Sequence, residues 1–203
     1  MAIFNIKKRE LECKIVYYGP GRSGKTTNME YIYKTYKKQV VGEMVSVDTE
    51  GDRTLFFDFL PMGLGQIKGF DIKVQVYTVP GQVQYKSTRK LVLKGVDGII
   101  FVADSLVVRR EKNMLSLKDL QHNLKEYGIN IVKIPLIMQH NKRDLTGQGV
   151  PVMTVEQMER DLNRQLKVPS FPASAIIGEG VGATLKECLK LTLLSLKKQI
   201  KSG

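Results

Sequence analysis

The segment "GPGRSGKT", residues 19–26, constrains the fold of this chain more than any other feature. It matches in full the pattern in which a glycine, four variable residues, a second glycine and a lysine precede Ser or Thr. A strand-like apolar run, residues 11–18, comes before it, and a helical pattern, residues 25–38, follows it. A loop in this position surrounds an oxyanion with backbone N–H groups, and the helix N-terminus adds partial positive charge. The segment therefore predicts a phosphate site at the end of the first strand of an α/β sheet.

The residues of this loop have separate predicted roles. Gly21 and Gly24 let the backbone approach the phosphate without a Cβ in the way. Lys25 supplies a full positive charge to the outer phosphates, and the Thr26 hydroxyl is a hard oxygen ligand for Mg²⁺. A glycine turn with a chance lysine is the alternative, and the flanking strand and helix argue against it. The nucleotide-contacting residues that we predict in this loop are Gly19, Gly21, Ser23, Gly24, Lys25, Thr26 and Thr27.

Beyond this loop, apolar runs alternate with helical patterns along the chain. This alternation is typical of an α/β three-layer sandwich with a mostly parallel central sheet. Residues 54–60 and 70–79 flank a glycine-rich segment and predict one antiparallel hairpin at the sheet edge. Residues 96–104 and 134–141 are continuous apolar runs, as expected for central parallel strands.

Composition limits the classes of partner. The net charge is +12 at pH 7, but the lysines and arginines are spread over several segments, so we do not expect sequence-specific nucleic-acid binding. The sequence contains no apolar stretch of about 20 residues, so we expect no membrane-spanning helix. Cys13 and Cys188 lie in apolar patterns and predict buried thiols in a reducing, cytoplasmic setting. We predict that residues 1–203 form one domain, closed by a basic helix at about residues 182–200 that packs on the core.

The tetrapeptide "NKRD", residues 141–144, follows a predicted central strand, at the edge where open α/β sheets bind their ligands. The Asp144 carboxylate can accept two hydrogen bonds from the N1–H and N2–H₂ edge of guanine, whereas adenine offers no such pair of donors there. We therefore predict that the nucleotide is GTP or GDP. The remaining base-end residues brace the ring or offer backbone N–H groups to the guanine O6, and they are Asn141, Lys142, Ser174 and Ala175.

The segment "YTVPGQ", residues 77–82, nearly matches a γ-phosphate sensor but carries Thr78 where an aspartate is usual. Gly81 can offer its N–H to a γ-phosphate, and Gln82 can align an attacking water. Mg²⁺ commonly keeps several waters, so Thr78 can still hydrogen-bond one of them. Two alternatives stay open: a nearby acid, Asp52 or Asp58, compensates for the missing aspartate, or Mg²⁺ binds more weakly.

Taken together, these motifs resemble those of the Ras-like small GTPases. The longer stretches "KIVYYGPG", "GDRTLFFDFLP" and "RKLVLKGVDGIIFVADS" are similar to those of the bacterial MglA-type GTPases, which control cell polarity and gliding motility. The resemblance implies a slow GTPase with bound Mg²⁺ that binds effectors in its GTP state and acts in the cytoplasm, recruited to a cell pole. It implies that Thr54 is a second metal ligand and that Arg53 is an arginine finger carried in cis. It also implies an MglB-type roadblock-fold activating protein, and a register shift in the strand between Thr54 and Leu60.

Other functions remain open from the sequence. A GTP-occupancy module with negligible hydrolysis, acting as a scaffold, is favoured by the missing aspartate. The positive charge suggests either a nucleic-acid-linked GTPase or a protein that docks on acidic proteins or anionic lipids. The last of these is compatible with a GTP-dependent switch.

Overall fold

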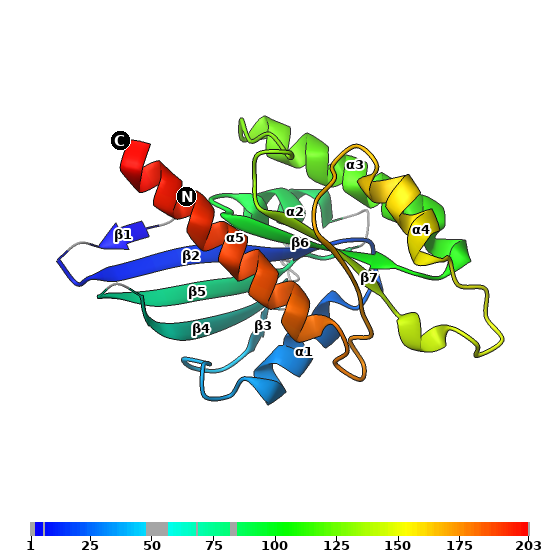
Figure 1. Cartoon of the computed structure of the whole chain (residues 1–203), viewed down its shortest axis with the longest axis horizontal. Coiled ribbons are helices and arrows are strands. Elements are labelled where there is room, and N and C mark those ends of the chain that lie inside the picture. The colour runs from blue at the N-terminus through cyan, green and yellow to red at the C-terminus, as the bar shows by residue number, and fades with distance from the viewer. Residues whose placement is uncertain (1–2, 6, 48–56, 68, 82–84, 203) are drawn as a thin grey trace.

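The computed structural model of this protein describes every residue except 1–2, 6, 48–56, 68, 82–84 and 203. Strands and helices alternate along most of the chain (Figure 1). In chain order the elements are β1 Ile3–Asn5, β2 Glu10–Tyr18, α1 Lys25–Thr35, β3 Val45–Val47, β4 Phe57–Ile67, β5 Phe70–Thr78, α2 Lys86–Leu93, β6 Gly98–Asp104, the 3₁₀ turn η2 Val107–Arg109, α3 Arg110–Glu126, β7 Leu136–Asn141, the 3₁₀ turn η3 Arg143–Leu145, α4 Val155–Met158, the π-helical turn η4 Glu159–Asn163, β8 Ser170–Pro172 and α5 Val181–Ser202.

The described residues form a sheet of eight strands, seven of them in the order β3-β4-β5-β2-β6-β7-β8, with β1 beside β2. Strands β5, β2, β6, β7 and β8 are parallel, whereas β3, β4 and β1 pair antiparallel to their neighbours. Helices cover both faces of the sheet, which confirms the predicted α/β sandwich and its hairpin, β4–β5 (Figure 1). The hairpin is not the outermost part, because β3 pairs with β4 beyond it. Residues 45–47 are too few to show a strand period in the sequence, so this edge strand was not predicted.

The core lies on both faces of the sheet because successive side chains of a strand point to opposite sides. On β2, Ile15 and Tyr17 pack with the residues under α1 and α5, while Val16 and Tyr18 pack under α2 and α3. All four are fully buried, and each large apolar side chain buried in this way contributes about 1.5–3 kcal/mol. The apolar runs of β6 and β7 are buried along their whole length. These buried strands fix the carboxyl edge of the sheet, from which the loops of the candidate site extend.

Several element bounds differ from the sequence prediction. The helix after the first loop ends at Thr35 instead of residue 38. Strand β4 continues to Ile67 through the glycine-rich segment, with a register irregularity between Gly63 and Gln66. At Thr154 the side chain caps α4, since its hydroxyl accepts from the Gln157 N–H.

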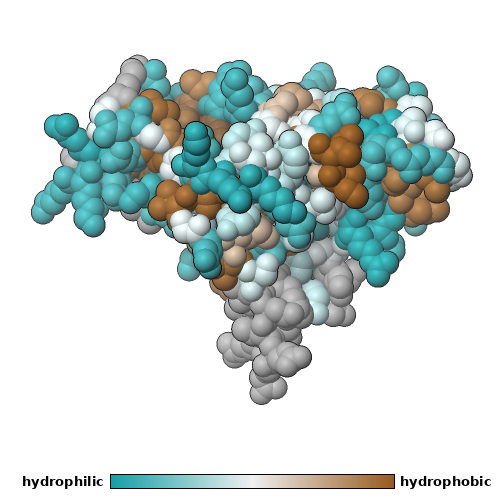
Figure 2. Space-filling model, turned by 90° about the horizontal axis from the view of Figure 1, so that it is seen from below, coloured by the Kyte–Doolittle hydropathy of each residue, from teal (hydrophilic) through white to brown (hydrophobic). Residues whose placement is uncertain are grey.

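Helix α5 packs its apolar side on the sheet, with Leu185 and Cys188 buried. Cys13 is buried as well, and burial raises the pKa of both thiols to about 12. In the part of the chain that the structure describes, no helix combines the length and the apolar character that crossing a membrane requires. On the face shown in Figure 2, hydrophobic residues form separate patches between hydrophilic ones. Patches of this kind are ordinary on a folded protein surface.

Candidate functional site

The loop between β2 and α1 lies against two neighbouring strands, and its glycines make this approach possible. Gly19 has φ +144°, and a Cβ there would stand 2.2 Å from the carbonyl oxygen of Val102 on β6. Gly24 has φ +97° and caps the N-terminus of α1, and a Cβ there would stand 2.2 Å from Asn141 Nδ2. Any side chain at these positions would push the loop off the sheet edge. The predicted phosphate loop is therefore seated against β6 and β7.

One asparagine joins three segments that are far apart in the sequence. Asn141, at the end of β7, donates from Nδ2 to the Ser23 carbonyl at 2.7 Å and accepts at Oδ1 from the Ala175 N–H at 2.8 Å. Asp144 accepts a 2.6 Å hydrogen bond at Oδ1 from the Ser174 hydroxyl. The predicted base-reading residues thus lie beside the phosphate loop, held by hydrogen bonds within the protein.

The two backbone amides that we predicted to reach guanine O6 have acceptors inside the protein. The Ala175 N–H donates to Asn141, and the Ser174 N–H donates to the Glu179 carbonyl at 2.9 Å. The contribution seen for Ser174 is its hydroxyl, which orients Asp144. The amide contact to O6 stays a prediction.

A buried acid, Asp104, forms an ion pair with Lys142 at the base end of the site. Lys142 has a left-handed backbone, φ +70°, and its Nζ lies 2.7 Å from Asp104 Oδ2 at the end of β6. The Asp104 side chain is fully buried, and Arg109 Nε lies 3.6 Å from the same oxygen. Our reading of the sequence missed both Asp104 and Arg109. The available signal was an acid that ends an otherwise apolar strand run.

Lys25 is buried and bonds to its own loop. Its Nζ donates to the Pro20 carbonyl at 2.8 Å and to the Gly19 carbonyl at 3.1 Å. Burial, together with the neighbouring cations Arg89 and Arg109, lowers the pKa of Lys25 to about 7, although Asp58 acts in the opposite direction. A lysine in such a position gains its charge most readily when an anion comes close. This environment suits a phosphate ligand.

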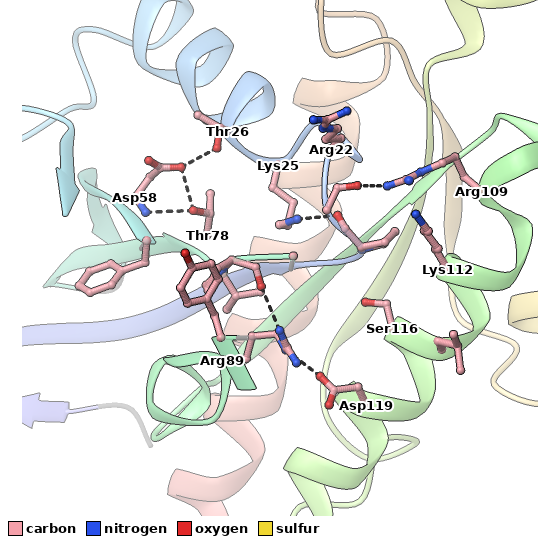
Figure 3. A pocket seen from close by; sticks show the side chains of 18 of the residues that line it. Arg22, Lys25, Thr26, Asp58, Thr78, Arg89, Arg109, Lys112, Ser116 and Asp119 are labelled. Atoms are coloured by element: carbon pink, nitrogen blue, oxygen red, sulfur yellow. Dashed lines mark hydrogen bonds and ion pairs between the residues drawn. The ribbon is translucent and has the colours of Figure 1, made fainter. Parts of the chain in front are cut away.

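Asp58 on β4 accepts hydrogen bonds from three hydroxyl groups at the phosphate end, and Figure 3 labels two of these residues, Thr26 and Thr78. Its Oδ2 accepts from Thr26 Oγ1 and from Thr78 Oγ1, each at 2.8 Å, and its Oδ1 accepts from Ser46 at 2.9 Å. The Asp58 N–H in turn donates to Thr78 Oγ1 at 2.9 Å. The structure therefore places Asp58 beside the predicted metal ligand and beside the threonine that replaces the usual aspartate. Asp52, the other candidate acid, lies outside the described residues.

These oxygens fit a magnesium ion. Carboxylate and hydroxyl oxygens are hard donors, which Mg²⁺ prefers, and Mg²⁺ takes only one or two protein ligands when phosphates and waters complete its shell. Among the described residues, no group of three or more His, Cys, Asp or Glu is placed to hold a metal. Of the described residues, Thr26 would be a ligand of such a metal and Asp58 would lie beside it, with oxygens of the nucleotide and water completing the shell.

The segment after β5 lies directly on the phosphate loop. A Cβ on Gly81 would stand 2.2 Å from the Gly21 nitrogen and 2.4 Å from the Pro20 carbonyl carbon. Helix α2 follows this segment, and its Arg89 bonds Asp119 on α3 at 2.8 Å through Nε. The other predicted residues of the phosphate end, Arg53, Thr54 and Gln82, lie outside the described residues.

The phosphate end opens into a cleft of about 1090 Å³ between the loop, β4, α2 and α3. Cations surround it, with Lys25, Arg109 and Lys112 directed at the loop from different elements (Figure 3). Thr26 is exposed at its floor, and Thr27 is half-buried one residue further along α1. A cleft lined in this way attracts an anion and disfavours a cationic or purely apolar ligand.

Comparisons with known proteins agree with this chemistry. Residues 1–192 match the ADP-ribosylation factor family. The chain is 52% identical over 198 residues to the mutual gliding-motility protein MglA of Myxococcus xanthus, covering 98% of this chain and 99% of that protein. It is 28% identical to the human ADP-ribosylation factor-like protein 4C, covering 92% and 90% of the two chains. A similar match, 28% identical, covers 88% of this chain and 86% of ADP-ribosylation factor-like protein 2 of Arabidopsis thaliana.

Proposed function

Because this chain belongs to the ADP-ribosylation factor family and is a small GTPase, we propose that it acts as a molecular switch that binds GTP, hydrolyses it to GDP and phosphate, and binds effectors while GTP is present. The observation that carries this proposal is the junction made by Asn141. Its side chain ties the phosphate loop at Ser23 to the segment at Ala175, and the hydroxyl of Ser174 in that segment donates to Asp144. One ligand with a phosphate end and a guanine end would span this junction.

The nucleotide contacts follow from the groups present. Loop 19–26 and the N-terminus of α1 surround the phosphates, and Lys25 leaves its two carbonyl partners to pair with the outer phosphate oxygens. Asp144 reads the donor edge of guanine, with one oxygen oriented by Ser174. A base without that donor pair leaves a carboxylate unmatched, so adenine nucleotides bind more weakly.

We assign the work of the missing switch aspartate to Asp58. Thr26 and Thr54 would hold Mg²⁺ directly, and Asp58, hydrogen-bonded to both Thr26 and Thr78, would accept from a metal-bound water. The ion, when bound, neutralises charge that develops on the phosphate oxygens. An acid on β4 thereby does from the neighbouring strand what an acid at position 78 would do from β5.

Hydrolysis is in-line attack by water and depends on positioning and charge. We propose that Gln82 aligns the water and that Arg53 places a guanidinium on the developing charge, a contribution of roughly 10³- to 10⁵-fold when such a group is correctly placed. Gln82→Ala and Arg53→Ala should therefore keep GTP binding and turn over far more slowly. Wild-type turnover in either variant would remove that residue from the mechanism.

The close approach of Gly81 to Gly21 supports the proposed switch. A γ-phosphate that accepts from the Gly81 N–H must lie between these two residues, which the arrangement seen here brings together. Binding of GTP would therefore displace the segment from Gly81 to α2, and the strand between Thr54 and Leu60 would shift its register. Hydrogen exchange of residues 45–75, compared between GDP and a GTP analogue, measures this change. Identical protection in the two states would exclude it.

The cellular setting is proposed from the relative named for gliding motility. We propose that the protein works in the cytoplasm, is recruited to a cell pole, and controls polarity or gliding. An MglB-type roadblock-fold protein would act as its activating partner by ordering the loops around the phosphate. The basic surface would then serve contacts with acidic proteins.

Calorimetry of purified wild-type protein tests the binding proposal directly. We expect GDP to bind in the presence of Mg²⁺ and ADP to bind far more weakly. Equal affinity for both nucleotides would overturn the assignment. Single-turnover GTP hydrolysis with and without the activating partner then separates a timed switch from an occupancy module, which would show negligible hydrolysis in both.

A further inference from the structure

Arg109 crosses from the start of α3 to the phosphate loop. It is the last residue of η2, and its Nη2 donates to the Gly21 carbonyl (Figure 3). Its Nε lies 3.6 Å from Asp104 Oδ2. The side chain is 17% exposed, so the guanidinium is largely removed from water. Burying the charge of an arginine is costly unless the side chain is paired and hydrogen-bonded, so these contacts are required to hold Arg109 in this position.

The peptide unit between Gly21 and Arg22 indicates what Arg109 does in the loop. A trans peptide is planar, and its C=O and N–H point in opposite directions. Because the Gly21 carbonyl points at Arg109, the N–H of the next residue, Arg22, points away from it. Arg22 also has φ +63°, an uncommon left-handed backbone for a residue with a side chain. Backbone N–H groups presented through left-handed residues form concave anion sites.

We propose that Arg109 is a positioning residue for the nucleotide phosphates. By holding the Gly21 carbonyl, it keeps the Arg22 N–H turned into loop 19–26, where a phosphate oxygen accepts it. This inference rests on the proposed guanine-nucleotide function and adds a residue to its phosphate site.

Asp104 makes the arrangement specific. The Oδ2 atom of this buried carboxylate forms ion pairs with Arg109 Nε at 3.6 Å and with Lys142 Nζ at 2.7 Å. One acid therefore restrains a side chain at each end of the site. The planar arginine fork reaches the acid and the carbonyl together, whereas the single ammonium group of a lysine has no such fork.

Two substitutions on the same helical segment provide a matched test. Arg109→Gln removes the guanidinium, while Arg110→Gln removes a neighbouring exposed arginine that pairs with Asp161 at 2.7 Å. We expect Arg109→Gln to raise the dissociation rate of GDP roughly tenfold to 100-fold and to move the β-phosphate resonance in ³¹P spectra of the bound nucleotide. Arg110→Gln should leave both unchanged. The affinity for guanosine, which lacks phosphates, should stay the same in both variants.

A measurement on the wild-type protein keeps the test independent of how the variants fold. The Arg22 amide proton should shift downfield when GDP is added, as expected for a new hydrogen bond to a charged oxygen. An Arg22 amide that does not respond to GDP, or an Arg109→Gln variant with wild-type dissociation rate and phosphate spectrum, overturns the inference. If the wild-type protein does not bind GDP at all, the proposed function fails and the inference fails with it. If GDP binds but the Arg22 amide does not respond, only the inference fails.

Discussion

The base end and the phosphate end of the site differ in how far their side chains are already arranged to contact a ligand. At the base end, Asn141, Asp144 and Lys142 are each held by a hydrogen bond or ion pair to another segment, at 2.6 to 2.8 Å. At the phosphate end, the groups that should contact ligand contact the protein instead. Lys25 bonds loop carbonyls and Thr26 bonds Asp58.

The difference shows which end can recognise and which end can respond. Under the proposed function, the base end would need little rearrangement to accept guanine, so it would discriminate between nucleotides in either state. The phosphate end would exchange its internal partners for ligand oxygens, and we propose that this exchange carries the signal to α2 and β4. We therefore expect base selectivity and switching to reside in separate parts of the site, so that a substitution can disturb one without the other.

The largest expected effect is at the base end, in Asp144→Asn. The amide would donate where guanine also donates, so the affinity for GDP should fall roughly 10²- to 10⁴-fold, from the loss of two hydrogen bonds to a charged group. Xanthosine diphosphate, which carries a carbonyl in place of the 2-amino group, should bind better to the variant than to the wild type. Calorimetry with both nucleotides measures the exchange, and Asp161→Asn serves as the control. A GDP affinity within threefold of wild type would show that Asp144 does not read the base.

A smaller effect is expected at the phosphate end, in Asp58→Asn. Loss of this carboxylate should weaken Mg²⁺ binding about 10- to 100-fold, the usual cost of removing a group that orients a metal ligand. The preference for guanine over adenine should survive, because the base end is untouched. Titration of Mg²⁺ into the GDP complex, followed by the nucleotide dissociation rate, gives the shift. If selectivity fell together with Mg²⁺ affinity, the two ends would not be separate.

The smallest effect concerns His140, which lies in β7 just before Asn141. Burial, assisted by Arg143, lowers the pKa of His140, although Glu159 opposes this. The folded protein therefore resists protonation that the unfolded chain accepts below about pH 6.5. Stability should fall on acidification through that range, by at most about 1.4 kcal/mol per pH unit. Denaturant unfolding with saturating GDP at pH 7 and pH 5.5 should show this loss in wild type and in His122→Gln, but not in His140→Gln. An equal loss in all three would assign the pH dependence elsewhere.

The sequence predicted the parts of the site that are written as contiguous motifs. Residues 19–26 and 141–144 each follow a strand directly, so local pattern and strand position were enough to place them at the carboxyl edge of the sheet. The fold class followed in the same way from the alternation of strands and helices. Contacts between residues of different segments could not be predicted from local sequence patterns, because they depend on strand order and register.

From the sequence, Asp58 is one of two candidate acids, although the alternation of residues along its strand already favours it. On β4, the buried positions alternate with partly exposed ones, and Asp58 falls on the buried side with Leu60 and Met62. An acid in phase with apolar residues is a candidate for a site, since burial of a lone carboxylate is costly. Arg109 carries no such signal. Its role depends on the carbonyl direction of Gly21, which no pattern of residue types encodes.

Thr78 is bonded to Asp58 twice, as donor through its hydroxyl and as acceptor from the backbone N–H. A carboxylate at position 78 would meet the carboxylate of Asp58 at hydrogen-bond distance with no proton between them. Like charges at that separation repel, and one of the pair would have to stay protonated. Two acids on adjacent strands thus exclude each other here. In this chain, threonine at 78 is the complement that an aspartate at 58 requires, and the two positions should be exchanged only as a pair.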